Sequence, residues 1–230
     1  MRGPAGVAMR EMKAVRRIIA VLLLAVAGAA HAQDEIPLAD QLAGLEPAPR
    51  IAYLRHLIAE GRRDAEVYFQ MAVAFHEQGT VDSALTYYDR TIGIDPMHFK
   101  SYVNRGVLLD DLGNTQSAIQ SFSTAGAINP DDVLANAHLA FLLHQMGDHR
   151  EAWRYLSHAL EIDPGHPQTR FYLAIFFWDA RIYREAMREW EAVIEAEPDG
   201  FLARKARDNI MLLQKALNAP SSEGGWEPEL

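Results

Sequence analysis

The apolar residues of this chain recur at intervals of three and four, the spacing that one face of an amphipathic helix requires. The pattern predicts one helix that ends near residue 79 and a second helix from about 82 to 94. Gly79 stands between them, at a position where the left-handed end of a helix favours glycine. The apolar positions of the first helix are Tyr68, Met71, Ala72 and Phe75.

This pair of predicted helices recurs with a period of 34 residues. A proline closes each period, because proline lacks a backbone N–H and clashes with the preceding helical turn. The prolines are Pro96, Pro130, Pro164 and Pro198. A small residue recurs where two helix backbones come close, and a large apolar residue follows four positions later. These pairs are Ala84 and Tyr88, Ala118 and Phe122, Ala152 and Leu156, and Ala186 and Trp190. The period predicts four units, at 65–98, 99–132, 133–166 and 167–200.

The residues at fixed positions in these units resemble the tetratricopeptide repeat. The second unit matches the family pattern at Tyr102, Gly106, Leu109, Gly113, Ala118, Phe122, Ala125 and Pro130. The third matches it at Leu139, Ala140, Leu143, Gly147, Ala152, Leu156, Ala159 and Pro164. The resemblance covers residues 65–200 and implies an all-α fold, a right-handed superhelical solenoid of helix-turn-helix repeats.

Four positions depart from the family pattern. Asn136 and Arg170 replace the aromatic residue that opens a unit. Arg105 replaces a leucine, and we expect its charged end to reach a neighbouring acid while its stem lies on apolar surface. Arg181 replaces the glycine between the two helices of the fourth unit, which predicts a differently capped turn.

The two ends of a solenoid need a cover, because a terminal repeat has no neighbour for one apolar face. Within the N-terminal segment 33–64, an amphipathic helix predicted at 48–60 provides one cover. A helix within 201–218 provides the other. Residues 219–230 have the composition of a linker and are predicted to be disordered. Trp226 in this tail is either a docking anchor or an aromatic residue without a role.

Residues 1–32 have the composition of a signal peptide. Basic residues precede an uncharged run of 13 residues, and Ala30-His31-Ala32 follows as a cleavage site. A retained membrane anchor is the alternative, but a helix needs about 20 apolar residues to span a bilayer. We therefore predict cleavage after Ala32, a mature chain that begins at Gln33, and export to the periplasm, with secretion as the second possibility.

Charge and motifs exclude several functions. Without residues 1–32 the chain has 17 basic and 30 acidic residues, a net charge of −13. Such a chain repels nucleic acid and anionic membrane surfaces. It has no cysteine, phosphate-binding loop, nucleophile elbow or zinc-protease motif. We therefore predict no catalysis, no cofactor and no metal site. His138 and His144 point about 120° apart on one helix, so we expect exposed, solvated histidines.

The resemblance implies that the first helix of each unit lines a concave groove. An apolar stripe at the fifth and ninth positions of each unit predicts that this groove binds a hydrophobic peptide or an amphipathic helix, with Phe141 and Phe171 at its centre. Chaperone-binding members of the family carry Lys and Asn where this chain has Phe69 and Val73, so carboxylate clamping is not predicted. The predicted groove residues are Phe69, Val73, His76, Val103, Asn104, Val107, Asp110, His138, Phe141, His144, Phe171, Ile175 and Trp178.

These observations predict a non-catalytic protein-interaction scaffold in the cell envelope. Three alternatives stay open at this point. In the first, the stripe thickens the core or is covered by the N-terminal segment. In the second, the chain self-assembles through the stripe as a homo-oligomer. In the third, the protein is an accessory subunit of an envelope enzyme complex.

Overall fold

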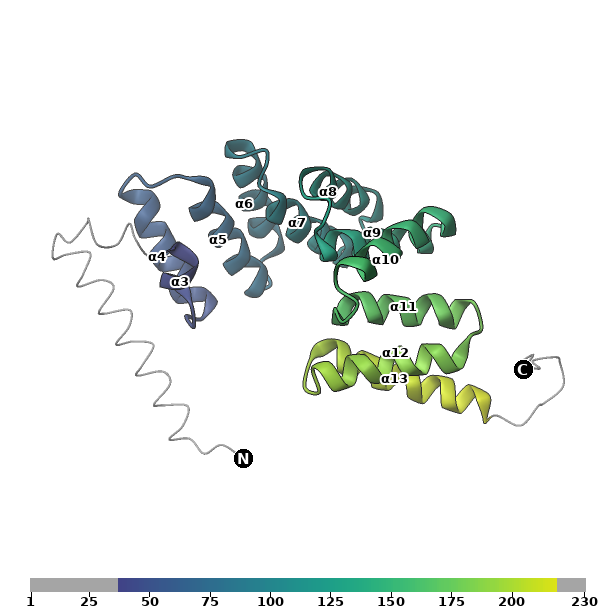
Figure 1. Cartoon of the computed structure of the whole chain (residues 1–230). Coiled ribbons are helices and arrows are strands. Elements are labelled where there is room, and N and C mark those ends of the chain that lie inside the picture. Colours follow the sequence, from purple (N-terminus) through teal and green to yellow (C-terminus); the bar gives the residue numbers. More distant parts are fainter. Residues whose placement is uncertain (1–36, 219–230) are drawn as a thin grey trace, which may run out of the picture. The chain divides into compact units, whose positions relative to one another are not determined.

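A computed structural model describes residues 37–218. The predicted signal peptide and the predicted tail at 219–230 lie outside these residues. Eleven helices and no strand occur between residues 37 and 218, which confirms the all-α prediction (Figure 1). No helix in this part of the chain is long and apolar enough to cross a membrane. The helices form two compact units, divided at Leu108–Leu109 within helix α7.

The first unit contains α3 to α6 and most of α7. The helix bounds are α3 Leu38–Leu42, α4 Pro47–Ala59, α5 Ala65–Glu77, α6 Val81–Ile94 and α7 Phe99–Asp111. Helix α4 covers the segment predicted as the N-terminal capping helix and packs on α5, whereas the short α3 was not predicted. The carboxylate of Asp64 starts α5 by accepting a hydrogen bond from the Val67 N–H at 3.0 Å. Fully buried side chains from three helices form the core, including Leu54, Met71 and Tyr88.

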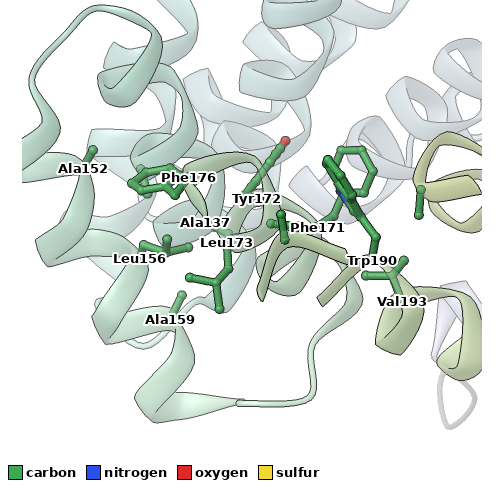
Figure 2. Packing of buried hydrophobic residues seen from close by; sticks show 14 of the residues in the cluster. Ala137, Ala152, Leu156, Ala159, Phe171, Tyr172, Leu173, Phe176, Trp190 and Val193 are labelled. Carbon is green, nitrogen blue, oxygen red and sulfur yellow. The ribbon is translucent and has the colours of Figure 1, made fainter. Parts of the chain in front are cut away.

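The second unit contains the end of α7 and six further helices. Their bounds are α8 Thr115–Ile128, α9 Val133–Gln145, α10 His149–Ile162, α11 Pro167–Asp179, α12 Tyr183–Ala196 and α13 Phe201–Leu217. Neighbouring helices pack as antiparallel pairs around one core. Figure 2 shows Leu156 of α10 on one side of α11, and Trp190 and Val193 of α12 on the other. Helix α13 packs on α12 and α11 and adds Leu213 to the core.

Three departures from the family pattern satisfy their polar groups inside their own unit. The Arg105 Nε donates to Asp89 Oδ1 at 2.8 Å, which confirms the predicted acidic neighbour. Asn136 replaces an aromatic residue and donates from Nδ2 to two backbone carbonyls, at 2.7 and 2.8 Å. Arg170 reaches Glu189 at 2.8 Å.

The prediction for Arg181 is wrong. A glycine with positive φ ends the first helix in each of the first three repeats, and Arg181 adopts the same conformation with φ 62°. The Arg181 N–H donates to Trp178 O at 2.9 Å, and the Ile182 N–H donates to Phe177 O at 2.8 Å. Gly147 and Asp148 make the corresponding bonds in the third repeat. The backbone of this turn therefore has the same conformation as in the other repeats. Arg181 adopts the left-handed conformation, which is unfavourable for a residue with a side chain.

Candidate binding site

The predicted groove residues at the fifth position of each repeat are core residues in the structure. Phe69, Val103 and Phe171 have exposed fractions of 9%, 5% and 6%. The Phe69 ring lies 4.7 Å from the ring of His98, measured between centroids. This burial agrees with the alternative in which the apolar stripe thickens the core. A ligand contact through these side chains stays a prediction.

The residues at the ninth position are only partly buried. They are Val73, Val107, Phe141 and Ile175. Phe141 stacks on Tyr172, with ring centroids 4.3 Å apart and planes inclined by 7°. Part of each side chain therefore lies at the surface, where a partner could contact it.

His138 is buried, so the prediction of a solvated histidine is wrong at this position. Its ring stacks on Phe122 at 4.9 Å, and its Nδ1 lies 3.0 Å from the Tyr172 hydroxyl. Burial, and to a smaller extent the nearby His166, lower the pKa of His138 to about 4. His138 is therefore neutral at pH 7 and belongs to the core.

Three of the remaining groove candidates, His76, Asn104 and Trp178, contact side chains of their own unit. His76 Nδ1 lies 3.3 Å from the Tyr88 hydroxyl, and the Asn104 side chain hydrogen-bonds the same tyrosine. Burial raises the pKa of Asp110, and the adjacent Asp111 raises it further. The Trp178 ring lies between other aromatic rings, 5.7 Å from Trp190 and 6.1 Å from Tyr183.

His144 borders an apolar cavity of about 520 Å³ in the second unit. This volume is within the range of pockets that hold small ligands or side chains. We call this cavity the turn pocket, because the helix-helix turns of the third and fourth repeats form it. It is lined by His144, His149, Trp153, Phe176, Phe177, Asp179, Ala180 and Ile182.

Each wall of the turn pocket comes from the end of a helix. Helix α9 contributes His144 near its C-terminus, and α10 contributes residues of its first two turns. Helix α11 contributes its last turn, and Ile182 directly precedes α12. The Trp153 and Ile182 side chains remain exposed, at 50% and 43%. Large apolar side chains at such positions indicate a binding surface when they line a cavity together.

A chain of polar contacts forms one edge of the turn pocket. His144 Nε2 lies 2.7 Å from Asp179 Oδ2, and His144 Nδ1 lies 3.1 Å from His149 Nδ1. His144 also stacks on Phe176, with ring centroids 4.0 Å apart. If His144 donates from Nε2 to the carboxylate, His149 must donate from Nδ1, because two neutral acceptors cannot bond. The His149 Nε2 is then the acceptor left for a ligand or water.

The turn of the fourth repeat exposes an apolar side chain where the other repeats have a polar one. The residue before the second helix is Thr80, Asn114 and Asp148 in the first three repeats, and Ile182 in the fourth. Asp148 accepts a hydrogen bond from the Glu151 N–H at 3.3 Å. Ile182 makes no side-chain cap bond. Thr80 and Asn114 make no such bond either, so the fourth repeat differs in that its apolar isoleucine lines the turn pocket.

Sequence analysis identified only His144 among the residues of the turn pocket as a site residue. Ile182 carried a signal, because it breaks a series of polar residues on the 34-residue period. Trp153 follows the recurring small position of its unit, where the other units also have apolar residues, so its sequence position does not reveal its exposure.

The site has the composition of a binding surface. Within residues 37–218, no three His, Asp or Glu side chains converge in a way that would hold a metal ion. The turn pocket combines aromatic and aliphatic walls with one polar edge, which suits an apolar side chain that brings a hydrogen-bonding group.

Comparisons with known proteins agree with the repeat pattern. Two family models described as tetratricopeptide repeat match the chain, one at residues 51–96 and 70–133 and the other at 134–166. The matches span 51–166, just over half of the 230 residues. No curated protein matches the sequence.

Solved structures with the same fold include the following three proteins. A thermophilic TPR protein from Thermus thermophilus is 17% identical, with a TM-score of 0.60 over 72% of this chain and 91% of that one. MamA from Desulfovibrio magneticus RS-1 is 19% identical, with a TM-score of 0.57 over 71% and 91%. YrrB, described as a TPR protein with an unusual peptide-binding site, is 18% identical, with a TM-score of 0.54 over 74% and 88%. With its repeated helix pairs and these matches, the chain belongs to the tetratricopeptide repeat family.

Proposed function

We propose that this protein is a non-catalytic scaffold of the cell envelope that binds a protein partner through the turn pocket. The partner inserts an apolar side chain, from an extended peptide or an amphipathic helix, between Trp153 and Ile182. The observation that carries the proposal is the fourth-repeat turn, which has an arginine in place of the glycine and presents an isoleucine to an apolar cavity. YrrB, which shares the fold, is described as having a peptide-binding site.

The energetics support a binding role for this turn. A non-glycine residue in the left-handed conformation costs about 1–2 kcal/mol. Strain of this size persists where it serves function, because selection for stability alone removes it. The strained turn exposes Ile182, which lines the turn pocket together with the half-exposed Trp153.

The proposed location rests on the sequence of residues 1–32. Export would bring the acidic mature chain into the envelope, where tetratricopeptide proteins organise larger assemblies. The predicted groove surface at Phe141 and Ile175 would extend the contact beyond the turn pocket, because both side chains are partly exposed in the same unit.

Selection of peptides by phage display on the mature chain tests the proposal. We expect enriched peptides to share an aromatic or leucine anchor. Trp153→Ala and Ile182→Asp should each weaken their binding at least tenfold, because each removes an apolar wall of the turn pocket. Phe201→Ala is the matched control: this aromatic side chain is 61% exposed on α13 and does not line the pocket. If no peptide is enriched, or if all three variants bind equally, the proposal is wrong.

Self-assembly is the second candidate, and the surface of α13 favours it. Phe201, Met211 and Leu212 are more than half exposed on this helix. Light scattering after size exclusion separates the candidates, since self-assembly predicts a mass that rises with protein concentration. A constant monomer mass would eliminate it.

A further inference from the structure

We propose that the chain's own residues 219–230 occupy the turn pocket, with Trp226 as the inserted side chain. This inference rests on the proposed function, because it assigns an occupant to the same pocket. It makes the tail a competitor that a partner must displace.

The direction of the helices brings the start of the tail to the correct end of the unit. Helices α11, α12 and α13 follow one another as antiparallel neighbours. The C-terminal end of α13 therefore lies at the end of the unit that carries the α11–α12 turn, as Figure 1 shows. Ile182 of the turn pocket belongs to that turn.

The tail is long enough to reach the turn pocket. Helix α13 has 17 residues and α12 has 14, so α13 extends about 5 Å beyond the start of α12. Packed helices lie about 10 Å apart. Trp226 follows Leu217 by nine residues, which span up to about 30 Å when extended. The tail is therefore longer than the distance that it has to span.

The composition of the tail fits the turn pocket. Trp226 is the only aromatic residue in 219–230, and its indole combines a large apolar surface with one N–H donor. In the tautomer described above, His149 Nε2 is an acceptor at the pocket edge. Gly224 and Gly225, which precede Trp226, have no side chains that would have to fit beside the indole. The tail thus contains one aromatic residue that combines an apolar surface with a hydrogen-bond donor, as the turn pocket requires.

Paramagnetic broadening in the full mature chain tests the tail contact. The chain has no cysteine, so Pro228→Cys accepts a spin label at a single position beside Trp226. We expect the label to reduce the signals of the Trp153 indole N–H and the Ile182 amide at least twofold, equally at tenfold dilution. Trp226→Ala in the labelled chain should restore them, whereas Phe201→Ala should not. No broadening, or broadening that Trp226→Ala leaves unchanged, would overturn the proposal. Broadening only when labelled and isotope-enriched chains are mixed would also overturn it, because the tail would then occupy a second copy.

A competition experiment adds an independent readout. A synthetic peptide of residues 219–230 should bind the Trp226→Ala chain more tightly than the unaltered chain, by about tenfold for a peptide Kd of about 0.1 mM, because a tethered tail competes at an effective concentration of about 1 mM. Equal affinity for both chains would contradict occupation by the tail. If display-selected peptides still depend on Trp153 in that case, the proposed function survives and only the tail assignment fails. If they do not, the pocket itself has no binding role.

Discussion

Replacing Arg181 with glycine should stabilise the protein. Arg181 holds a φ of 62°, and a left-handed residue with a side chain costs about 1–2 kcal/mol. Glycine removes this strain but makes the unfolded chain more flexible, which offsets about 0.4–1 kcal/mol. We therefore expect Arg181→Gly to raise the free energy of unfolding by about 0.5–1 kcal/mol. For a chain of this length that corresponds to a rise in Tm of about 1–4 °C.

The third repeat provides the mirror-image control. Gly147 has φ 85°, and a Cβ built on it would meet no atom within 4 Å. Gly147→Arg therefore introduces the same backbone strain without a steric clash and should lower the stability by a similar amount. Urea unfolding followed by circular dichroism measures both changes. If Arg181→Gly destabilises the protein, or Gly147→Arg leaves its stability unchanged, then the strain assigned to the fourth-repeat turn does not exist.

Three further predictions concern the core, the titration of a buried histidine and the leader. Phe171→Ala should cost about 3–5 kcal/mol of stability because the side chain is buried, whereas Phe141→Ala should cost less and should weaken a captured partner by about 2 kcal/mol; melting curves and titration calorimetry distinguish the two effects. The pKa of His138 is about 4 in the folded protein, below its unfolded value, so the unfolded state takes up a proton first as the pH falls. The free energy of unfolding should therefore decrease by about 3 kcal/mol between pH 6.5 and pH 4. His138→Gln should make the stability measured by urea unfolding less dependent on pH across that window, and an unchanged slope would contradict the burial effect. Mass spectrometry of the protein from its producing cell should find an N-terminus at Gln33, and a retained leader would refute the cleavage prediction.

The repeat architecture was predictable because its signal is redundant. Each helix pair carries a small residue, a large apolar residue and a closing proline on one period, so a departure such as Asn136 does not hide it. Helix α3 has no such support. It is five residues long, and only Leu38 and Leu42 are buried in it. A segment this short does not show a helical period on its own.

The exposure of individual side chains was less predictable, because it depends on helices distant in sequence. His138 is covered by Phe122 and bonded to Tyr172, which is 34 residues away. Phe171 occupies a position that the family resemblance assigned to a groove, but the structure buries it in the core of the second unit. Periodicity identifies the face on which a residue lies. It does not reveal how much of that face a neighbouring helix covers.

The fourth repeat can carry a strained turn because its helices are held elsewhere. Trp190 and Val193 are almost fully buried in α12, and α13 covers the same helix from its other side. Burial of side chains of this size contributes about 1.5–3 kcal/mol each, which exceeds the cost of an uncapped helix start. The turn is therefore free to depart from the pattern without loss of the fold. An aspartate at position 182 would match Asp148, which caps α10, and would remove one apolar wall of the turn pocket. Ile182→Asp should accordingly leave the protein as stable as before or more stable, and bind the selected peptides at least tenfold more weakly. A variant that loses stability together with binding would show that Ile182 serves the core, and the turn pocket would then need no ligand to explain it.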